Sequence, residues 1–348
     1  LGVHFILLNR NKFNKMKQIT KNFIINHLSK ITNYYVPTFL INSIDMEPIA
    51  ACNLRCGFCQ VPGWDRAKTT NPMKLETFME IINKFRYLKH VKIQGMGEPL
   101  LNRKLQKMVE YASDKNIDTL INTNGVLLTE QLSNEFIDAR LSSMCFSFDG
   151  GKKETYEIAR EGAIYEKVVQ NIKYLCQLRT KKESSLRIGI TCLASNLDIL
   201  KEVPDLINLS CEIGVDYLHI KARLKNWKQH KNNSYSFSVT CNDDYEEFNE
   251  IRNKSILLAK QKGIKFTIGD SEDQYSDKNP CQWPWRSVYI STEGFVVPCC
   301  VIAMPETWNM GSILNETIEN IWNSKQYRLL RKSITSQKKP ITCINCYN

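Results

Sequence analysis

Two adjacent stretches decide how the chain is interpreted: Ile41-Asn42-Ser43-Ile44-Asp45-Met46-Glu47 and, shortly after it, Cys52-Asn53-Leu54-Arg55-Cys56-Gly57-Phe58-Cys59. The first is short and rich in apolar and β-branched residues, which predicts a β-strand. The second places three cysteines in the loop that follows this strand. Five later segments share the character of the first stretch, so six strands are predicted, at Ile41–Glu47, His90–Gln94, Asp118–Asn122, Ser143–Ser147, Arg187–Cys192 and Asp216–Lys221.

Helical patterns separate these predicted strands. They lie at Pro72–Tyr87, Arg103–Lys115, Thr129–Ala139, Tyr165–Arg179 and Leu197–Ile213. Alternation of strands and helices predicts an α/β fold with parallel strands joined by right-handed helical crossovers. Six such units are too few for a closed barrel of eight, so a partial (β/α)6 barrel and an open doubly wound sheet both fit the pattern.

Glycines and polar side chains gather just after the predicted strands. They occur at Cys52–Cys59, Gly95–Pro99, Thr123–Gly125 and Asp149–Gly151, and the sixth strand ends in His219, Lys221 and Arg223. Both candidate folds carry their functional site at the carboxyl ends of parallel strands. We therefore expect the site at this edge of the sheet.

The composition is that of an ordinary globular protein. With 43% apolar and 24% charged residues, and only 15 Gly and 11 Pro in 348 residues, the sequence excludes a disordered chain, a collagen-like repeat and a coiled coil. The 47 Lys and Arg residues against 36 Asp and Glu leave a net charge of +11. That charge favours anionic partners, although a solvated basic surface explains it equally well.

Cysteine is unusually frequent, with 13 residues in the chain. The apolar run Val3–Leu8 is too short for a secretory signal, and Arg10 and Lys12 follow it in place of a small-residue cleavage site. No stretch reaches the about 18–20 apolar residues that a membrane-spanning helix needs. We therefore expect a cytoplasmic, reducing location, where clustered cysteines indicate metal or catalytic chemistry more often than disulfides.

The cysteine loop itself favours iron and sulfur. Soft thiolates select iron–sulfur clusters or zinc, and a structural zinc ion takes four ligands. Cys52, Cys56 and Cys59 have no fourth Cys or His nearby, because the next histidine is His90. Three cysteines can hold three irons of a 4Fe–4S cluster and leave the fourth iron open for a substrate or cofactor. Zinc with a distant fourth ligand and three buried thiols are the alternatives.

The CxxxCxxC spacing, with an aromatic residue before its last cysteine, resembles the radical S-adenosylmethionine (radical SAM) superfamily. Gly95-Met96-Gly97-Glu98-Pro99 resembles that family's GGE motif, and the order of the motifs along roughly residues 41–220 is similar as well. The resemblance implies a partial barrel with a SAM-binding 4Fe–4S cluster on the three cysteines. It also implies SAM contacts from Phe58, Gly95, Gly97, Glu98, Asn124, Ser147 and Arg160, with Glu98 at the amino group of SAM and Arg160 at its carboxylate.

A second group of cysteines lies near the C-terminus. Residues Tyr289–Cys299 predict a β-hairpin with its turn near Glu293-Gly294, which would bring Cys281 and Cys299 together. Cys343 and Cys346 follow as a CxxC pair. This pattern resembles the SPASM or shorter twitch extension of radical SAM enzymes.

The second resemblance implies one auxiliary 4Fe–4S cluster. Its implied ligands are Cys281, Cys299, Cys343 and Cys346, with Cys300 as a possible replacement for Cys299. A four-cysteine zinc site is the alternative. The remaining cysteines are scattered and are expected to act as small hydrophobic residues, at Cys145, Cys176, Cys192, Cys211 and Cys241.

The sequence predicts three parts. They are a basic helical N-terminal extension at residues 1–40, a radical SAM core at 41–268 and a SPASM/twitch-like iron–sulfur domain at 269–348. Within the core, residues 222–242 are polar and predict a long loop. A helix at Asp243–Lys262 and a strand at Ile264–Ile268 follow it.

The radical SAM resemblance implies an enzyme that cleaves SAM reductively to a 5′-deoxyadenosyl radical, which takes a hydrogen atom from a substrate. We expect oxidation or epimerisation of a small polar molecule of the sugar or amino-sugar type, with the auxiliary cluster as electron acceptor. Basic residues at the barrel mouth favour a phosphorylated substrate, and His219, Lys221 and Arg223 are the candidate contacts. An electron donor such as flavodoxin or ferredoxin is the implied protein partner.

Two other functions stay open at this point. One is a radical SAM maturase that modifies a peptide or protein. The other is a non-catalytic, zinc-bearing nucleic-acid binder. The strand–helix alternation and the lack of a paired finger spacing near Cys52 argue against that binder.

Overall fold

The computed structural model of the chain describes residues 36–221, 245–269, 280–300, 303–344 and 346. Most of the expected N-terminal extension, the expected loop at 222–242 and Cys241 lie outside the described residues. Residues 36–40 are described and include a 3-10 turn, η1, at Thr38–Leu40. This segment packs near the C-terminal part of the chain, since the Val36 N–H donates to Asn323 Oδ1 at 2.7 Å.

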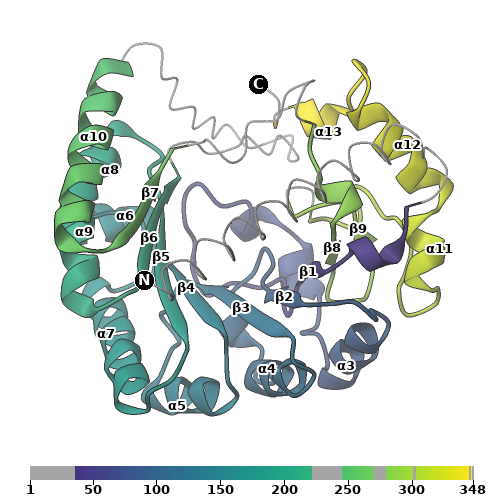
Figure 1. The fold of residues 1–348 in the computed structure, drawn as a ribbon, viewed down its shortest axis with the longest axis horizontal. Helices are drawn as coiled ribbons and strands as arrows, with labels where there is room; N and C mark the ends of the chain where they lie inside the picture. The colour runs from purple at the N-terminus through teal and green to yellow at the C-terminus, as the bar shows by residue number, and fades with distance from the viewer. Residues whose placement is uncertain (1–35, 222–244, 270–279, 301–302, 345, 347–348) are drawn as a thin grey trace, which may run out of the picture.

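The centre of the fold is a sheet of parallel strands whose spatial order follows their order in the chain (Figure 1). Strand order β7-β6-β5-β4-β3-β2-β1 means that every crossover moves in the same direction. A doubly wound sheet would reverse direction at a switch point, so the expected partial barrel is confirmed. The strands are β1 (Ser43–Met46), β2 (His90–Ile93), β3 (Asp118–Thr123), β4 (Ser143–Ser147), β5 (Arg187–Leu193), β6 (Tyr217–Lys221) and β7 (Lys265–Ile268).

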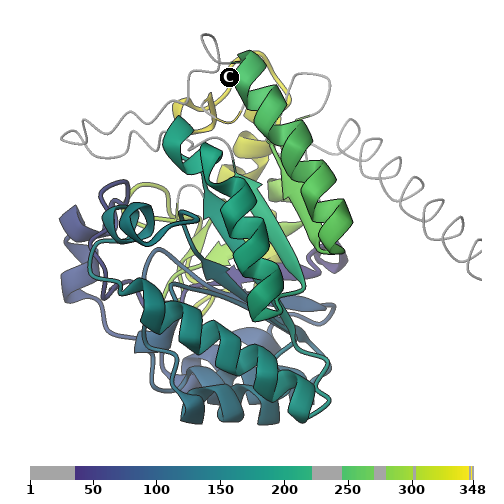
Figure 2. The ribbon, with the colours of Figure 1, turned by 90° about the vertical axis from the view of Figure 1, so that its left-hand side faces the viewer.

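Helices cover the outer face of this curved sheet, and Figure 2 shows them from the side. Buried residues recur on one side of each helix; in α7, for example, Val168, Ile172 and Leu175 are fully buried. The longer covering helices are α3 (Leu75–Asn83), α4 (Leu105–Asp114), α5 (Glu130–Asp138), α7 (Tyr165–Lys181), α9 (Val203–Ile213) and α10 (Tyr245–Lys262).

The single helix predicted over Leu197–Ile213 is wrong in one respect. The structure has two helices there, α8 (Leu197–Lys201) and α9, with Glu202 between them. Pro204 stands in the first turn of α9, where its missing N–H is tolerated, whereas its ring would clash with a carbonyl of a continuous helix. Two short helices, α2 (Arg66–Thr69) and α6 (Lys153–Ala159), were not predicted.

The C-terminal part extends the same sheet. Strand β8 (Ser287–Ile290) pairs in parallel with β1, and β9 (Val296–Val297) pairs antiparallel with β8. The predicted turn is present, with Gly294 at φ 83° and the Ser291 N–H bonded to the Phe295 carbonyl. The core is continuous from the barrel into this part, so the boundary at residue 268 stays a prediction.

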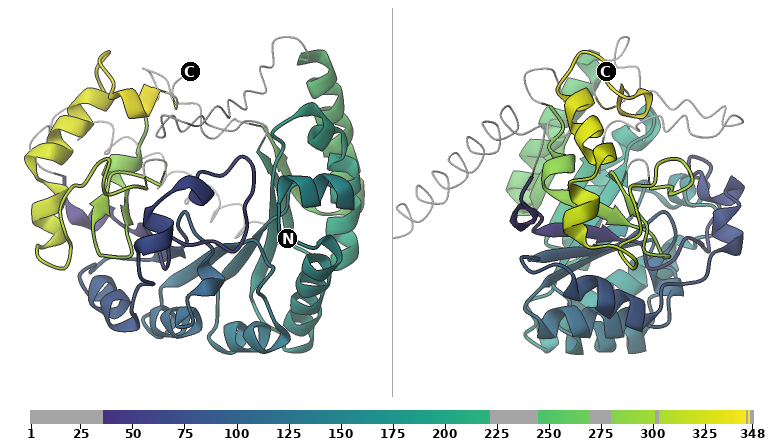
Figure 3. Two further views of the ribbon diagram at one scale, coloured as in Figure 1. Left: turned by 180° about the vertical axis from the view of Figure 1, so that it is seen from behind. Right: turned by 90° about the vertical axis from the view of Figure 1, so that its right-hand side faces the viewer.

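Short helices complete the C-terminal part, at the edge of the sheet opposite α10 (Figure 3). They are the 3-10 turn η4 (Trp283–Trp285) and the helices α11 (Ile318–Trp322), α12 (Lys325–Ile334) and α13 (Ile341–Ile344). None of the helices in the described ranges is both long and apolar enough to cross a bilayer.

Candidate functional site

The loop after β1 carries the three clustered cysteines. Cys56 is buried, Cys52 and Cys59 are partly buried, and all three are free thiols. A backbone hydrogen bond of 2.9 Å from the Cys59 N–H to the Cys56 carbonyl closes the turn between them. The Leu54 N–H points at the Cys52 sulfur from 3.5 Å. Such donors stabilise a thiolate, the form that binds iron.

Two neighbouring loops hold the cysteine loop in place. The Arg55 N–H donates to the Glu161 carbonyl at 3.0 Å. From the end of β3, Asn124 Nδ2 donates to Asn53 Oδ1 at 3.0 Å and lies 3.9 Å from Cys52 Sγ. Because Asn124 is itself 4% exposed, this amide is a fixed support. Its expected contact with SAM stays a prediction.

Burial and neighbouring charges shift the pKa values of the three cysteines in this loop. Burial raises the pKa of Cys52 to about 11, and the charges of Glu98, Cys59 and Cys56 add to the effect. Burial likewise raises the pKa values of Cys56 and Cys59, while the Arg160 guanidinium lowers both. The three thiols are close enough to influence one another, and a bound metal would favour their thiolate forms.

The described residues contain no group of three or more His, Cys, Asp or Glu side chains placed as the ligands of one metal ion. The donor set nevertheless suits an iron–sulfur cluster, because the soft sulfurs lie on one loop with N–H groups aimed at Cys52. Cys52, Cys56 and Cys59 are the residues that would hold it. Their ligation remains a prediction.

The two glycines after β2 allow close contact with the segment that leads into the cysteine loop. A Cβ atom on Gly97 would lie 2.3 Å from the Ala51 carbonyl oxygen and 2.5 Å from that of Ile49. On Gly95 it would lie 2.4 Å from Cγ of Glu47. Only glycine fits at either position without a shift of its neighbours.

Glu98 is 3% exposed, and its carboxylate ties two strand ends together. Oε1 accepts from the Leu100 N–H at 3.0 Å and from the Thr123 hydroxyl at 2.6 Å. Oε2 accepts from the Asn124 N–H at 2.8 Å. The structure thus gives Glu98 a structural role that the sequence did not suggest, and its expected contact with the SAM amine is a prediction still.

Arg160 also has a partner that the sequence did not suggest. Its Nη2 lies 2.6 Å from Oδ2 of Asp149, whose side chain is fully buried. The guanidinium stands over the ring of Phe58, 5.4 Å from its centroid. The cation is therefore beside Phe58 of the cysteine loop, and its expected contact with a SAM carboxylate stays a prediction. Asp149 was noted in the sequence only as part of a strand-end motif.

A row of polar side chains continues across the sheet from Ser147. Ser147, Thr191, His219 and Thr267 are register partners on β4 to β7. The residues that alternate with them pack under the helices, so this row faces the inside of the curved sheet. His219 Nδ1 lies 2.5 Å from Thr267 Oγ1, Lys221 is exposed at the strand end, and Arg223 lies outside the described residues.

The four candidate auxiliary ligands are partly buried, as is Cys300. Cys281 precedes η4, Cys299 follows β9, and Cys343 is in α13. The Cys346 N–H donates to the Cys343 carbonyl at 3.0 Å, which closes a turn across the CxxC pair. Joint ligation of a cluster by these cysteines stays a prediction.

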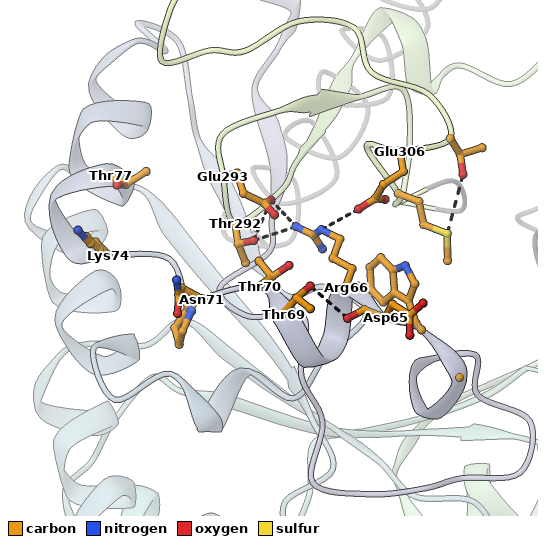
Figure 4. A pocket seen from close by; sticks show the side chains of 15 residues that line it. Asp65, Arg66, Thr69, Thr70, Asn71, Lys74, Thr77, Thr292, Glu293 and Glu306 are labelled. Carbon is orange, nitrogen blue, oxygen red and sulfur yellow. Dashed lines mark hydrogen bonds and ion pairs between the residues drawn. The ribbon is translucent and has the colours of Figure 1, made fainter.

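Arg66 links the cysteine-loop side of the barrel to the C-terminal hairpin, and no pattern in the sequence pointed to it. Its Nη1 lies 2.6 Å from Glu47 Oε2 just after β1, and its Nη2 donates to Thr292 Oγ1 at 2.8 Å and to Glu293. Glu306 is 3.4 Å from Nε. Figure 4 shows Arg66 between Glu293 and Glu306. These residues lie at one side of a cavity of about 900 Å3.

Comparison with known families gives two matches. Residues 46–192 match the sequence model described as the radical SAM superfamily. Residues 281–347 match the SPASM model, described as an iron–sulfur cluster-binding domain. The radical SAM match implies a 4Fe–4S cluster and SAM, and the SPASM match implies auxiliary iron–sulfur binding.

Individual proteins are similar over most of the chain. The tungsten-containing aldehyde ferredoxin oxidoreductase cofactor-modifying protein of Pyrococcus furiosus is 24% identical over 321 residues, which cover 86% of each chain. The AdoMet-dependent heme synthase of Methanosarcina barkeri is 24% identical, covering 83% of this chain and 84% of its own. Streptococcus suis SuiB bound to precursor peptide SuiA has a TM-score of 0.67 at 14% identity, covering 96% of this chain and 73% of its own.

Proposed function

Since the chain belongs to the radical SAM superfamily and ends in a SPASM domain, we propose that it uses SAM to remove a hydrogen atom from a peptide or protein side chain. The cluster and SAM, when bound, supply the 5′-deoxyadenosyl radical that this reaction requires. A flavodoxin- or ferredoxin-type protein is the proposed electron donor.

The observation that carries this proposal is the meeting of strand-end residues around the cysteine loop. Asn124 and the Glu161 carbonyl fix the loop from two sides. Glu98 joins the β2 and β3 ends, and the Asp149–Arg160 pair supplies a fixed cation next to Phe58. Held this way, the loop keeps its sulfurs oriented without movement, which preorganises the site.

The proposal of a peptide substrate takes its lead from SuiB, which has a similar fold and whose structure holds the precursor peptide SuiA. The row of polar side chains on the inner face of the sheet also supports a peptide substrate. Ser147, Thr191, His219 and Thr267 offer hydroxyls and an imidazole, which suit the amide groups of a peptide. A site for a phosphorylated substrate is expected to include lysine or arginine. Neither occurs among these four residues.

A small polar molecule is the second candidate. The relative from Methanosarcina barkeri favours this second candidate, because it is named as an AdoMet-dependent heme synthase and heme is not a peptide. In that case His219 and Lys221 are the candidate contacts on the described strands.

Anaerobic reconstitution with iron, sulfide and SAM, followed by reduction and quantification of 5′-deoxyadenosine, tests the proposal. The wild type is expected to form 5′-deoxyadenosine, and Cys56→Ala is expected to form none. Cys211→Ala is the matched control, because Cys211 lies on α9, away from the strand-end loops. Formation of 5′-deoxyadenosine by Cys56→Ala would refute the mechanism.

The substrate class is tested in the same assay with deuterated probes. Synthetic peptides with deuterated side chains and deuterated sugar phosphates are supplied separately. Deuterium in 5′-deoxyadenosine from the peptides supports the proposal, whereas deuterium from the sugar phosphates alone supports the second candidate.

A further inference from the structure

Arg331, on α12, is a buried cation with no acidic partner among the described residues. It is 3% exposed, and its Nε donates to the Pro284 carbonyl at 2.8 Å. Within the ranges that the structure describes, Nη1 and Nη2 have no hydrogen-bond partner. By contrast, Arg66, which is buried, and Arg160, which is partly buried, each lie 2.6 Å from a fully buried carboxylate. Burial of an uncompensated charge costs several kcal/mol, on the order of the stability of a domain.

The surroundings of Arg331 offset only part of that cost. The rings of Trp322 and Tyr327 lie 4.5 and 5.1 Å from its Cζ atom. Cation–π contacts stabilise a desolvated cation, but they do not supply a counter-charge. The polar atoms of these rings, and the indole N–H of Trp285 on η4, have no partner among the described residues either. A group of buried donors with no acceptor indicates that an acceptor-rich, negatively charged group belongs beside them.

Two of the candidate auxiliary ligands, Cys281 and Cys299, lie on segments near Arg331. Pro284, which accepts the hydrogen bond from Nε, follows Cys281 by three residues. The phenol of Tyr327, whose ring Arg331 contacts, is within electrostatic reach of Cys299. The segment that bears Cys281 therefore contacts the guanidinium directly, and Cys299 lies near the phenol that packs against it.

We infer that Arg331 is the buried counter-charge of the auxiliary iron–sulfur cluster and raises its reduction potential. A cluster held by four thiolates is an anion whose negative charge grows by one on reduction. A buried cation near the cluster therefore stabilises the reduced state more than the oxidised state. The inference rests on the auxiliary ligand set proposed above, but it does not depend on the substrate.

The test is an EPR-monitored redox titration of the fully loaded protein without turnover. The signal that SAM leaves unchanged reports the auxiliary cluster. Arg331→Met is expected to lower the reduced-to-oxidised ratio at the wild-type midpoint at least tenfold, a shift of about 59 mV for one electron. Arg331→Lys keeps the charge and is expected to shift the ratio less. Lys332→Met removes the neighbouring exposed charge and is expected to leave the potential unchanged.

Each outcome decides the inference. A loaded Arg331→Met or Arg331→Gln protein with the wild-type potential overturns it. If neither neutral variant retains iron and sulfide on the C-terminal cysteines while Arg331→Lys does, the need for positive charge is established directly. If Arg331→Lys also fails to retain them, the side chain matters for its shape and the inference is overturned. Because 5′-deoxyadenosine is not measured, failure here leaves the proposed function standing.

Discussion

The carboxylate of Asp149 lies 2.6 Å from Nη2 of Arg160, with the Asp149 side chain fully buried and that of Arg160 14% exposed. The other carboxylate oxygen of Asp149 accepts the Leu193 N–H at 2.6 Å. One residue therefore fixes both the end of β5 and the cation beside the cysteine loop. Contacts within the barrel itself therefore set the position of the Arg160 guanidinium.

Asp149→Asn is expected to destabilise the protein by about 3–5 kcal/mol, because it leaves Arg160 buried without its counter-charge. Urea unfolding measures the loss. Glu166→Gln is the control, since its pair with Lys153 is on the surface and is expected to add nothing measurable. Equal stability of the two variants would contradict the role of the pair.

Arg66→Met is expected to destabilise the protein by a similar amount, about 3–5 kcal/mol, because it leaves the buried carboxylate of Glu47 without its counter-charge. It also removes the link to the hairpin turn at Thr292. Adding Glu47→Gln to Arg66→Met is expected to recover part of the loss, which a double-mutant cycle by urea unfolding quantifies. Lys68→Met, an exposed change on the same helix, is the control. An additive cycle would contradict direct coupling.

The buried carboxyl group of Asp45 is expected to make the stability of the protein depend on pH. Burial raises the pKa of Asp45, opposed by the charge of Lys92 and the hydrogen bond from Gln94. The folded state therefore binds more protons than the unfolded chain between the ordinary and the raised pKa, so the free energy of unfolding falls as pH rises through that window. Asp45→Asn removes this fall.

The stability difference between Asp45→Asn and wild type is thus expected to grow in favour of the variant as the pH rises from the ordinary aspartate pKa through the raised pKa of Asp45. Urea titrations at several pH values measure it, with the exposed Asp65→Asn as control. A difference independent of pH would show that the Asp45 carboxyl does not titrate in this range.

Sequence reasoning reached the fold because its evidence was local. Apolar strand segments, helical periodicity and glycine-rich strand ends each lie within a few residues, and these indicated parallel crossovers and the edge that bears the site. The choice of a partial barrel came from the family resemblance, and the strand order bears it out. Pro204 was the overlooked local signal, since it marks the break between α8 and α9.

The partners of the buried charges could not be found this way. Arg66 meets Thr292 across 226 residues, and Arg160 meets Asp149 only because α6 turns back toward β4. Such pairs depend on the tertiary fold and leave no periodic pattern in one sequence. Glu98 shows the same limit, because its motif suggested a ligand contact while its hydrogen bonds to Thr123 and Asn124 needed coordinates.

Gly97 and Gly57 provide the sharpest test of the site's packing. A Cβ atom on Gly97 would meet backbone atoms of residues 49–51 at 2.3–2.6 Å, and backbone cannot move aside as a flexible side chain does. Gly97→Ala is therefore expected to cost about 1–3 kcal/mol or more and to displace the segment that leads into the cysteine loop. Gly57→Ala, inside that loop, has nothing within 4 Å of the added atom and is the matched control.

The measurements are urea unfolding and the iron and sulfide retained after anaerobic reconstitution. Gly97→Ala is expected to lose both stability and iron, while Gly57→Ala keeps both near wild type. If Gly57→Ala lost iron as severely as Gly97→Ala, the loop itself would be intolerant of any change, and the contact between the two strand-end loops would not be what holds the cysteines. Full retention by Gly97→Ala would equally refute the close approach of these loops.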